Sequence, residues 1–406
     1  MILFEDEGGE GLQPLTSWRS VFELRLGRRT LFDEVAHILQ RKVRGVWTRG
    51  RMAAVAAERF GLPVNEPATP DVILVNGRWF PDGPVAFPAA PCVGRVGRTV
   101  VFVVCDQGLA EKLSAADLLA EDRRPAALDG IAEVETTGRV VRYPWELIGD
   151  LSRQLLAEWR DGDAAIEADL DPHVTLCARE HVHIGERANI HPTASIDASG
   201  GPVFIGPDVT IGAQAVIEGP VYLGAGTRVN PRSWLHGGNA IGPVCKVGGE
   251  IDGCIICGYS NKQHDGFLGH AYVGCWVNIG AGTNNSDLKN TYGTVRVPVN
   301  GVLVDTGQQF FGAAIGDHAK LGIHTTLPTG AIVGFGAVAA TSKVLPKYVP
   351  AFGWLTDDGM SRGDTGKLIE VATTVMRRRQ VTITEAEVAL FRELHARSDR
   401  MNRGGA

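Results

Sequence analysis

Residues 205–247 decide the fold and read IGPDVTIGAQAVIEGPVYLGAGTRVNPRSWLHGGNAIGPVCKV. An aliphatic residue occupies every sixth position of this stretch, and a glycine often follows it. A period of six fits neither a 3.6-residue helix nor the two-residue alternation of a single strand; it is typical of the hexapeptide β-helix, in which three short strands make one triangular turn. The glycines allow the chain to round each corner. The eight aliphatic positions are Ile205, Ile211, Ile217, Leu223, Val229, Leu235, Ile241 and Val247.

The same spacing continues on both sides of this stretch, so we predict a left-handed β-helix over residues 173–342. A long excursion before Ile315 interrupts it, and an interruption of a solenoid is usually a loop on one face. The further aliphatic positions are Ile184, Ile190, Ile196, Ile256, Leu268, Val273, Ile279, Ile315, Leu321, Leu327 and Val333.

The remaining sequence predicts three flanking regions. Residues 1–142 alternate strand and helix patterns, which indicates an α/β domain. In it we expect strands at 2–4, 71–77 and 99–104 and helices at 30–41 and 110–119. Residues 143–172 indicate a helical linker. Residues 343–406 indicate an extended segment at 348–354, then helices at 367–380 and 384–397.

Composition limits the function classes. The 406 residues carry a net charge of −6 with both signs mixed, which argues against a nucleic-acid partner. No apolar run reaches the ~18 residues of a membrane span. The N-terminal residues do not read as a signal peptide, and the seven irregularly spaced cysteines suit reduced thiols, so we expect a cytoplasmic protein. The single Cys254–Cys257 pair has no second pair beside it, and we predict no metal site there.

A dense polar cluster lies where the six-residue spacing weakens, at residues 258–269 and 278–290. A solenoid needs no histidine or lysine there, whereas acyl transfer to an amine needs a base that works near neutral pH. His264 is the candidate base. His270, His318 and His324 are its rivals, of which the last two are expected at corners of the coil. Lys262 or Lys246 is expected to hold an acceptor phosphate, with Arg228 and Arg232 as further cations and Asn278 orienting a sugar.

Two other motifs suggest phosphate contact. The glycine-rich segment with Gly9 and Gly11, followed by Arg19 and Arg25, is expected to bind a nucleotide or sugar phosphate through backbone N–H groups, or to be an ordinary turn. The run Met376-Arg377-Arg378-Arg379 is expected to be either a solvated helix face or a contact for a nucleotide or coenzyme.

These motifs resemble a known family. The coil, Lys262, residues 264–269 and residues 278–283 resemble the acetyltransferase half of bifunctional UDP-N-acetylglucosamine pyrophosphorylase/glucosamine-1-phosphate N-acetyltransferase, in a divergent bacterial branch of sugar nucleotidyltransferases. The resemblance implies that His264 is the general base, that Asn278 contacts the acceptor and that acetyl-CoA is the donor, bound between the prisms of a homotrimer. It also places Glu250, Phe267 and Asp287 near the acceptor, with Phe267 where a tyrosine is expected.

The resemblance is weaker in the first 140 residues. The family's Gly-Asp turn that holds Mg²⁺ is replaced by Asn76-Gly77-Arg78, so nucleotidyl transfer is expected either through an altered site, with Mg²⁺ as a cofactor, or not at all. Three functions stay open. The first is acetylation of a sugar-phosphate amine, most directly glucosamine 1-phosphate, coupled or not to uridylyl transfer; the second is acylation of a nucleotide-linked amino sugar; the third is a non-catalytic sugar-nucleotide-binding trimeric scaffold.

Overall fold

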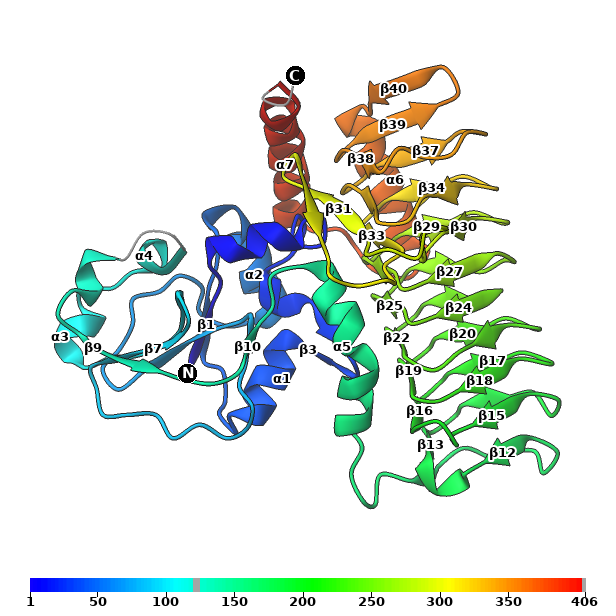
Figure 1. Ribbon diagram of the computed structural model, residues 1–406, viewed down its shortest axis with the longest axis horizontal. Coiled ribbons are helices and arrows are strands. Elements are labelled where there is room, and N and C mark those ends of the chain that lie inside the picture. Colours follow the sequence, from blue (N-terminus) through cyan, green and yellow to red (C-terminus); the bar gives the residue numbers. More distant parts are fainter. Residues whose placement is uncertain (120–124, 404–406) are drawn as a thin grey trace. The chain divides into compact units, whose positions relative to one another are not determined.

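The computed structural model describes residues 1–119 and 125–403, and its contacts separate two compact units (Figure 1). Unit 1 comprises residues 1–24, 29–143 and 385–393, and unit 2 comprises most of the remainder. The predicted ranges 1–142 and 343–406 each include a few positions outside the described residues.

Unit 1 is built on a six-stranded mixed sheet in the order β4-β1-β5-β8-β7-β9. The strand β1 (Ile2–Phe4) is parallel to both of its neighbours, and β8 (Thr99–Val104) is antiparallel to both of its own. The other strands are β3 (Arg29–Thr30), β4 (Gly45–Trp47), β5 (Ile73–Asn76), β6 (Trp79–Phe80), β7 (Cys92–Val96), β9 (Ala132–Glu135) and β10 (Arg139–Val140). The helices are α1 (Leu31–Ile38), α2 (Ala53–Phe60), α3 (Gln107–Ala110) and α4 (Ala115–Leu119), with 3₁₀ turns at Glu7–Leu12, Val21–Glu23, Gly50–Met52 and Ala126–Leu128.

The prediction of one helix over residues 110–119 is wrong, because two short helices share this region. The Asp106 carboxylate caps α3 by accepting a hydrogen bond from the Leu109 N–H at 2.8 Å. Ser114 donates from its backbone N–H to Asp117 at 2.8 Å and starts α4. Each cap fixes its own helix start, so the chain turns between them.

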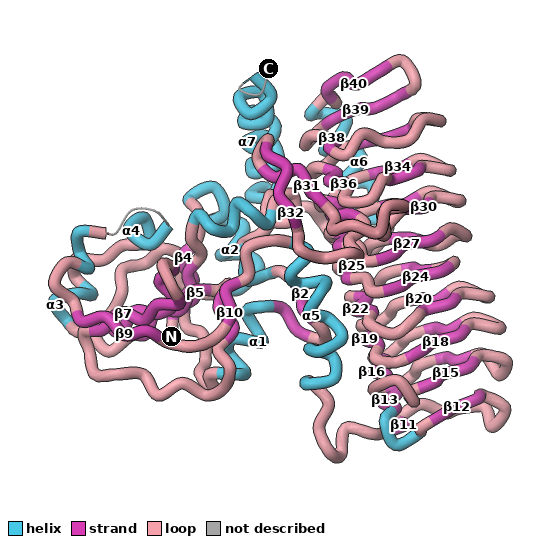
Figure 2. The backbone as a smooth tube through the Cα atoms, viewed as in Figure 1, coloured by secondary structure: helices cyan, strands magenta, loops and turns pink. Residues whose placement is uncertain are grey.

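Unit 2 contains the predicted left-handed β-helix together with the helices α5 and α6 and residues 394–403 of α7, and the predicted fold class is confirmed (Figures 1 and 2). Three parallel sheets form the sides of the prism, and the chain visits them in the order face 1, face 2, face 3. Face 1 consists of β11 (Ala165–Ile166), β13 (Val182–Ile184), β16 (Val203–Ile205), β19 (Val221–Leu223), β22 (Asn239–Ile241), β25 (Ile255–Ile256), β28 (Tyr272–Val273), β33 (Ala313–Ile315), β36 (Ala331–Val333) and β38 (Tyr348–Val349).

Face 2 has the same number of strands and ends in an antiparallel hairpin. It consists of β14 (Asn189–Ile190), β17 (Thr210–Ile211), β20 (Arg228–Val229), β23 (Lys246–Val247), β26 (Asn261–Lys262), β29 (Asn278–Ile279), β34 (Lys320–Leu321), β37 (Val338–Ala340), β39 (Gly353–Thr356) and β40 (Gly359–Arg362). Face 3 is shorter and consists of β12 (Thr175–Cys177), β15 (Ser195–Asp197), β18 (Val216–Glu218), β21 (Trp234–Leu235), β24 (Glu250–Asp252) and β27 (Phe267–Gly269), followed by the separate pair β30 (Asn284–Asn285) and β35 (Thr326–Leu327).

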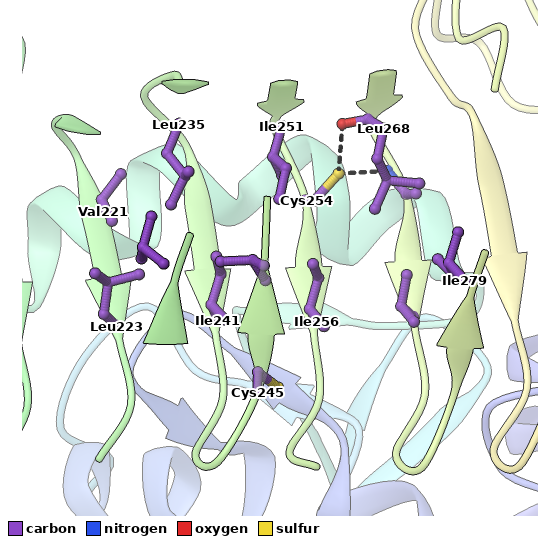
Figure 3. Close-up of a cluster of buried hydrophobic side chains, with 14 of the residues drawn as sticks. Val221, Leu223, Leu235, Ile241, Cys245, Ile251, Cys254, Ile256, Leu268 and Ile279 are labelled. Carbon is purple, nitrogen blue, oxygen red and sulfur yellow. Dashed lines mark hydrogen bonds between the residues drawn. The ribbon is translucent and has the colours of Figure 1, made fainter. Parts of the chain in front are cut away.

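The aliphatic residues of the six-residue pattern fill the interior of the prism, stacked turn upon turn. Figure 3 shows Leu223, Ile241 and Ile256 on face 1 beside Leu235, Ile251 and Leu268 on face 3. All of these side chains are at most 1% exposed. The predicted corner positions of His318 and His324 are confirmed, and both have the positive φ that these corners require.

The coil extends past residue 342. The segment predicted as an extended tail instead continues two faces, because Val349 pairs in register with Val333 and Leu355 pairs with Ala339. The excursion after β30 carries the hairpin of β31 (Arg296–Val299) and β32 (Val302–Asp305).

The helices α5 (Pro144–Ala157), α6 (Thr365–Arg377) and α7 (Glu385–Arg403) complete the chain, with a short strand β2 (Arg25–Leu26) in unit 2 and a 3₁₀ turn at Arg179–His181. α5 packs on face 1, where the segment after it brings Trp159 within 4.9 Å of the Phe204 ring. Faces 2 and 3 carry the residues of the predicted site.

Candidate functional site

Lys262 points into the prism, where backbone carbonyls surround its ammonium. Its side chain is 1% exposed, and its ammonium donates to the carbonyls of Gly248 at 3.0 Å, His264 at 2.6 Å and Gly266 at 3.0 Å. Burial lowers the pKa of Lys262 to about 8. The expectation that Lys262 holds a phosphate is therefore wrong, because three carbonyls already satisfy its three N–H donors. Lys262 fixes the corner that carries His264.

Asn285 is a second polar residue in the interior, one turn further along. Its amide accepts from the Gly269 N–H at 2.7 Å and donates to the Gly269 carbonyl at 2.8 Å. Its neighbour Asn284 accepts from the Phe267 N–H at 2.7 Å. The two ends of β27 are thus held by side chains, and the polar interior lies in the same turns as the predicted site.

His264 lies on the corner between faces 2 and 3 and is exposed. Among the described residues, its ring has no hydrogen-bond partner. Gly266 shapes this corner, with φ at +123° and space for no side chain, since a Cβ there would lie 2.2 Å from the Thr283 carbonyl oxygen. The imidazole is open to an incoming ligand, and its role as a base stays a prediction.

Face 3 presents a histidine that the sequence reasoning missed. His236 lies between two carboxylates, with Nδ1 3.2 Å from Glu218 and Nε2 3.2 Å from Glu250. The Trp234 indole donates to the same Glu218 at 3.0 Å and stacks on the His236 ring at 4.2 Å. The predicted acceptor residue Glu250 is thus already engaged with His236. The spacing of 18 residues between Glu218 and His236, which is one full turn, could have predicted this contact, because it places the two residues at equivalent positions of adjacent turns.

A second histidine–carboxylate pair brings Asp287 and Phe267 together. His270 Nδ1 lies 2.8 Å from Asp287 Oδ2, and the His270 ring packs 5.0 Å from Phe310. Both predicted residues border Gly269, where a Cβ would lie 2.4 Å from the Asp287 carboxylate and 2.4 Å from the Phe267 ring. Asp287 orients the imidazole of His270, and Nδ1 is the ring nitrogen that faces the carboxylate.

Face 2 carries two of the predicted cations in one column, that is, at equivalent positions of successive turns. Arg228, Lys246, Asn261 and Asn278 pair in register on successive turns. The Asn261 amide donates to Asn278 Oδ1 at 3.3 Å. Burial lowers the pKa of Lys246, and the positive charges of Arg379, Arg228 and Arg378 lower it further.

The predicted acceptor residues are therefore divided between two faces that meet at the His264 corner. Arg228, Lys246 and Asn278 lie on face 2, and Glu250, Phe267 and Asp287 border face 3. Arg232 stands on a corner of the same kind as His264, two turns away, with φ at +59°. From Asn261 to His264 the chain spans at most ~11 Å, so the corner lies within reach of a ligand bound on either face.

In unit 1, the predicted phosphate loop is a 3₁₀ helix at Glu7–Leu12. The Gly9 N–H donates to the Asp6 carbonyl at 3.1 Å, so this donor is not offered to a ligand. Gly11 is needed for packing, because a Cβ there would lie 2.4 Å from the Arg142 carbonyl. Arg19 is buried, and its carbonyl accepts from Arg49 at 2.8 Å.

Asn76 takes part in a buried ion pair where the resemblance implies a metal. Arg78 is 0% exposed and donates to Asp6 through two nitrogens, at 2.6 and 2.7 Å, while Asn76 donates to Asp6 at 2.7 Å. The guanidinium supplies the positive charge that a cation would supply to this carboxylate. The three residues therefore do not fit Mg²⁺. Among the described residues, no group of three His, Cys, Asp or Glu side chains is placed to hold a metal ion.

Arg25 belongs to unit 2, whereas Gly9 and Gly11 belong to unit 1, and its place in a nucleotide site stays a prediction. Its backbone N–H donates to the Tyr272 hydroxyl at 2.7 Å, and that hydroxyl donates back to the Arg25 carbonyl at 3.0 Å. Its guanidinium lies over the Tyr222 ring at 5.4 Å. These contacts attach the segment to face 1.

Comparison with known sequences gives the relationship. Residues 1–161 match the family described as sugar nucleotidyl transferase. The chain is 29% identical over 194 residues to the bifunctional protein GlmU of Cyanothece sp., covering 47% of this chain and 37% of that protein. It is 32% identical over 163 residues to the bifunctional protein GlmU of Acidithiobacillus ferrooxidans, covering 39% and 34%. Over these ranges the chain is similar to the GlmU proteins. It spans about a third of the length of these curated relatives.

Two solved structures match part of the chain. One is the UDP-N-acetylglucosamine acyltransferase of Francisella novicida, at 16% identity and a TM-score of 0.33, covering 59% of this chain and 85% of that one. The other is also described as a UDP-N-acetylglucosamine acyltransferase, at 15% identity and a TM-score of 0.29, covering 57% of this chain and 90% of that one. Among the described residues, no helix is long and apolar enough to cross a membrane.

Proposed function

We propose that the chain is an N-acetyltransferase that transfers an acetyl group from acetyl-CoA to the amine of a phosphorylated amino sugar, with glucosamine 1-phosphate as the first acceptor to test. The observation that carries the proposal is the exposed His264 imidazole on a corner fixed from inside by Lys262. Lys262 donates to the carbonyls of His264 and Gly266 and so fixes the backbone of this corner, which is the support that a functional side chain needs. The relationship to the bifunctional GlmU proteins supports the same reaction.

The chemistry requires one proton acceptor. The amine nitrogen attacks the thioester carbonyl, a C–N bond forms and the C–S bond breaks. His264 takes the proton that the nitrogen loses, and the coenzyme leaves as a thiolate that is then protonated. An imidazole suits this task because its ordinary pKa is close to neutral.

The acceptor is held on both sides of the His264 corner in this proposal. Arg228 and Lys246 on face 2 bind its phosphate, and Asn278 binds a sugar hydroxyl. On face 3, the Phe267 ring and the Glu250 carboxylate border the amine. Acidic residues populate face 3, at Asp197, Glu218, Glu250 and Asp252, so an ammonium is favoured there and a phosphate is favoured on face 2.

Unit 1 is proposed to bind a sugar nucleotide. Its match to the sugar nucleotidyl transferase family supports binding, and the Asp6–Arg78 pair argues against a metal-assisted step at Asn76. We therefore derive no uridylyl transfer through these residues. A second acceptor class, a nucleotide-linked amino sugar, is favoured by four cations on and near face 2, which are Arg228, Lys246, Arg378 and Arg379. We further propose a homotrimer in which acetyl-CoA lies between adjacent prisms.

The test is acetyl transfer from acetyl-CoA to glucosamine 1-phosphate, with the acetylated product measured by mass spectrometry. His264→Ala is expected to lower kcat by about 100-fold or more, since a general base contributes 10²–10⁴-fold. His191→Ala is the matched control, because His191 is also exposed and occupies the same kind of corner in an earlier turn. Equal rates for wild type and His264→Ala would remove His264 from the mechanism, and wild type inactive on every amino sugar tested would reject the transferase.

A further inference from the structure

Four cations from distant parts of the sequence gather beside face 2. Arg228 and Lys246 lie on adjacent turns of one column, and Arg378 and Arg379 follow the last residue of α6. We call these four residues the α6 basic cluster. Arg228 and Arg378 are exposed, and Lys246 and Arg379 are partly buried.

Arg379 is fixed against the coil rather than free in solvent. Its guanidinium donates to Asn261 Oδ1 at 2.7 Å and, more weakly, to the Val244 carbonyl at 3.4 Å. Asn261 is the next residue of the Arg228–Lys246 column, so the arginine extends that column by one step. An arginine on a solvated helix face would have no such hydrogen bonds. These contacts therefore favour a ligand site over the alternative of a solvated helix face.

The cluster lacks an acidic counterpart. Among the described residues, no carboxylate forms an ion pair with any of its four members. The C-terminal end of α6 offers the equivalent of only about half a negative charge. The cations also repel one another: after burial, the positive charges of Arg379, Arg228 and Arg378 lower the pKa of Lys246 further. A bound anion would relieve this repulsion.

The extent of the cluster indicates the size of the anion. Adjacent strands of a sheet lie about 4.8 Å apart, so the two steps from Arg228 through Lys246 to Asn261 span roughly 10 Å of backbone. One phosphate group fits between two such residues, whereas three positions along a column match an elongated anion. Arginine forks and a lysine point charge are the usual protein partners of phosphoryl oxygens.

We propose that Arg228, Lys246, Arg378 and Arg379 form a binding site for a ligand that carries a pyrophosphate group. Two ligands of the proposed reaction have this chemistry: coenzyme A on the donor side and a nucleotide-linked amino sugar on the acceptor side. If the amino sugar occupies the site, Arg228 and Lys246 hold the phosphate attached to the sugar, as proposed above; if coenzyme A occupies it, that part of the acceptor assignment is replaced. The inference deepens the proposed function by naming the charged group that the ligand presents to face 2. It requires no turnover, so it can be tested apart from catalysis.

The experiment is isothermal titration calorimetry with inorganic pyrophosphate as the probe. Arg379→Gln and Lys246→Gln are each expected to weaken binding at least tenfold. Arg377→Gln is the matched control, because Arg377 is an exposed arginine at the same helix end but is not among the charges that act on Lys246. It is expected to change the affinity less than twofold. Circular dichroism melting confirms that the three variants fold.

Two further arms identify the source of the pyrophosphate. If Arg379→Gln weakens coenzyme A binding and spares UDP-glucosamine, the donor occupies the site; the converse result assigns the acceptor. Either result supports the proposal. No pyrophosphate binding by wild type at millimolar concentration, or equal affinities for Arg379→Gln, Lys246→Gln and Arg377→Gln, would overturn it. His264→Ala is expected to bind pyrophosphate like wild type, so a failed base assignment and a failed anion site give different results.

Discussion

Replacing Lys262 with methionine tests whether this residue is structural. Methionine keeps the length and most of the volume of the side chain but removes its donors. The Gly248 carbonyl is buried and would lose its partner outright, whereas the hydrogen bonds to His264 and Gly266 are only part-buried, so water can replace them in part. At about 1–3 kcal/mol for a buried group left unsatisfied, and less for the other two, we expect a loss of about 3–5 kcal/mol in the free energy of unfolding at pH 7.5.

The pH dependence of the same variant has a definite sign. Burial lowers the pKa of Lys262 from 10.5 to about 8. Between these values the unfolded chain holds more protons than the folded one, so the unfolding free energy of wild type rises with pH through this window. Below the window, Lys262 adds no pH dependence. The rise is about 3 kcal/mol. Lys262→Met lacks it, so the gap between the two proteins is expected to widen from pH 8 to pH 10.5.

Urea unfolding followed by far-ultraviolet circular dichroism at pH 7.5, 9 and 10 measures both effects. Lys367→Met is the matched control, since Lys367 is exposed on α6 and is expected to change stability by less than about 0.5 kcal/mol at every pH. A Lys262→Met protein as stable as wild type but weakened in glucosamine 1-phosphate binding would refute the structural role and restore Lys262 as a ligand contact.

Two other variants test the corner and unit 1. Gly266→Ala is expected to lower the free energy of unfolding by more than about 3 kcal/mol, because the new Cβ would lie 2.2 Å from Thr283 and the backbone at φ +123° is strained for alanine. Gly301→Ala is the control for the backbone strain alone, since Gly301 has φ +81° and open space around its Cβ. It is expected to lower the free energy of unfolding by about 1 kcal/mol. Arg78→Met is expected to lower the free energy of unfolding by about 3–5 kcal/mol, because it leaves the Asp6 carboxylate buried and unpaired. Arg98→Met, at an exposed arginine, is expected to be near neutral. Hydrogen exchange of residues 73–80 measures the loss of stability, and protection equal to wild type in Arg78→Met would contradict the ion-pair argument.

The coil was predictable because its six-residue period is visible in the sequence. The same period also predicts where two polar residues are buried. Ile256, Lys262 and Leu268 are spaced by six, as are Val273, Ile279 and Asn285. The interior positions of Lys262 and Asn285 therefore follow from phase alone. A lysine at an aliphatic position of the pattern is normally expected to be exposed, because lysine is rarely buried without partners. Here the partners are backbone carbonyls, which no sequence pattern displays.

Other features of the site depend on tertiary contacts that the pattern does not encode. Arg379 meets Asn261 across 118 residues of sequence, because of how the end of α6 packs on the coil. In unit 1, the replacement of the expected Gly-Asp turn by Asn76-Gly77-Arg78 was visible, but the burial of Arg78 against Asp6 was not. Short-range capping by Asp106 and Ser114 likewise divided a region whose apolar spacing favoured one helix.

The stacking of the coil limits how such chains change in length. Equivalent residues on one face, such as Ile205, Leu223 and Ile241, are 18 positions apart. An insertion of 18 residues adds a complete turn and leaves every later side chain on its own face. An insertion of six rotates everything beyond it by one side of the triangle, which would carry the His264 corner away from face 3 and from the Arg228 column. Whole turns can therefore be added without moving later side chains to another face, whereas other length changes must be absorbed locally, as in the 15-residue step from Ile241 to Ile256 or in the 286–312 excursion.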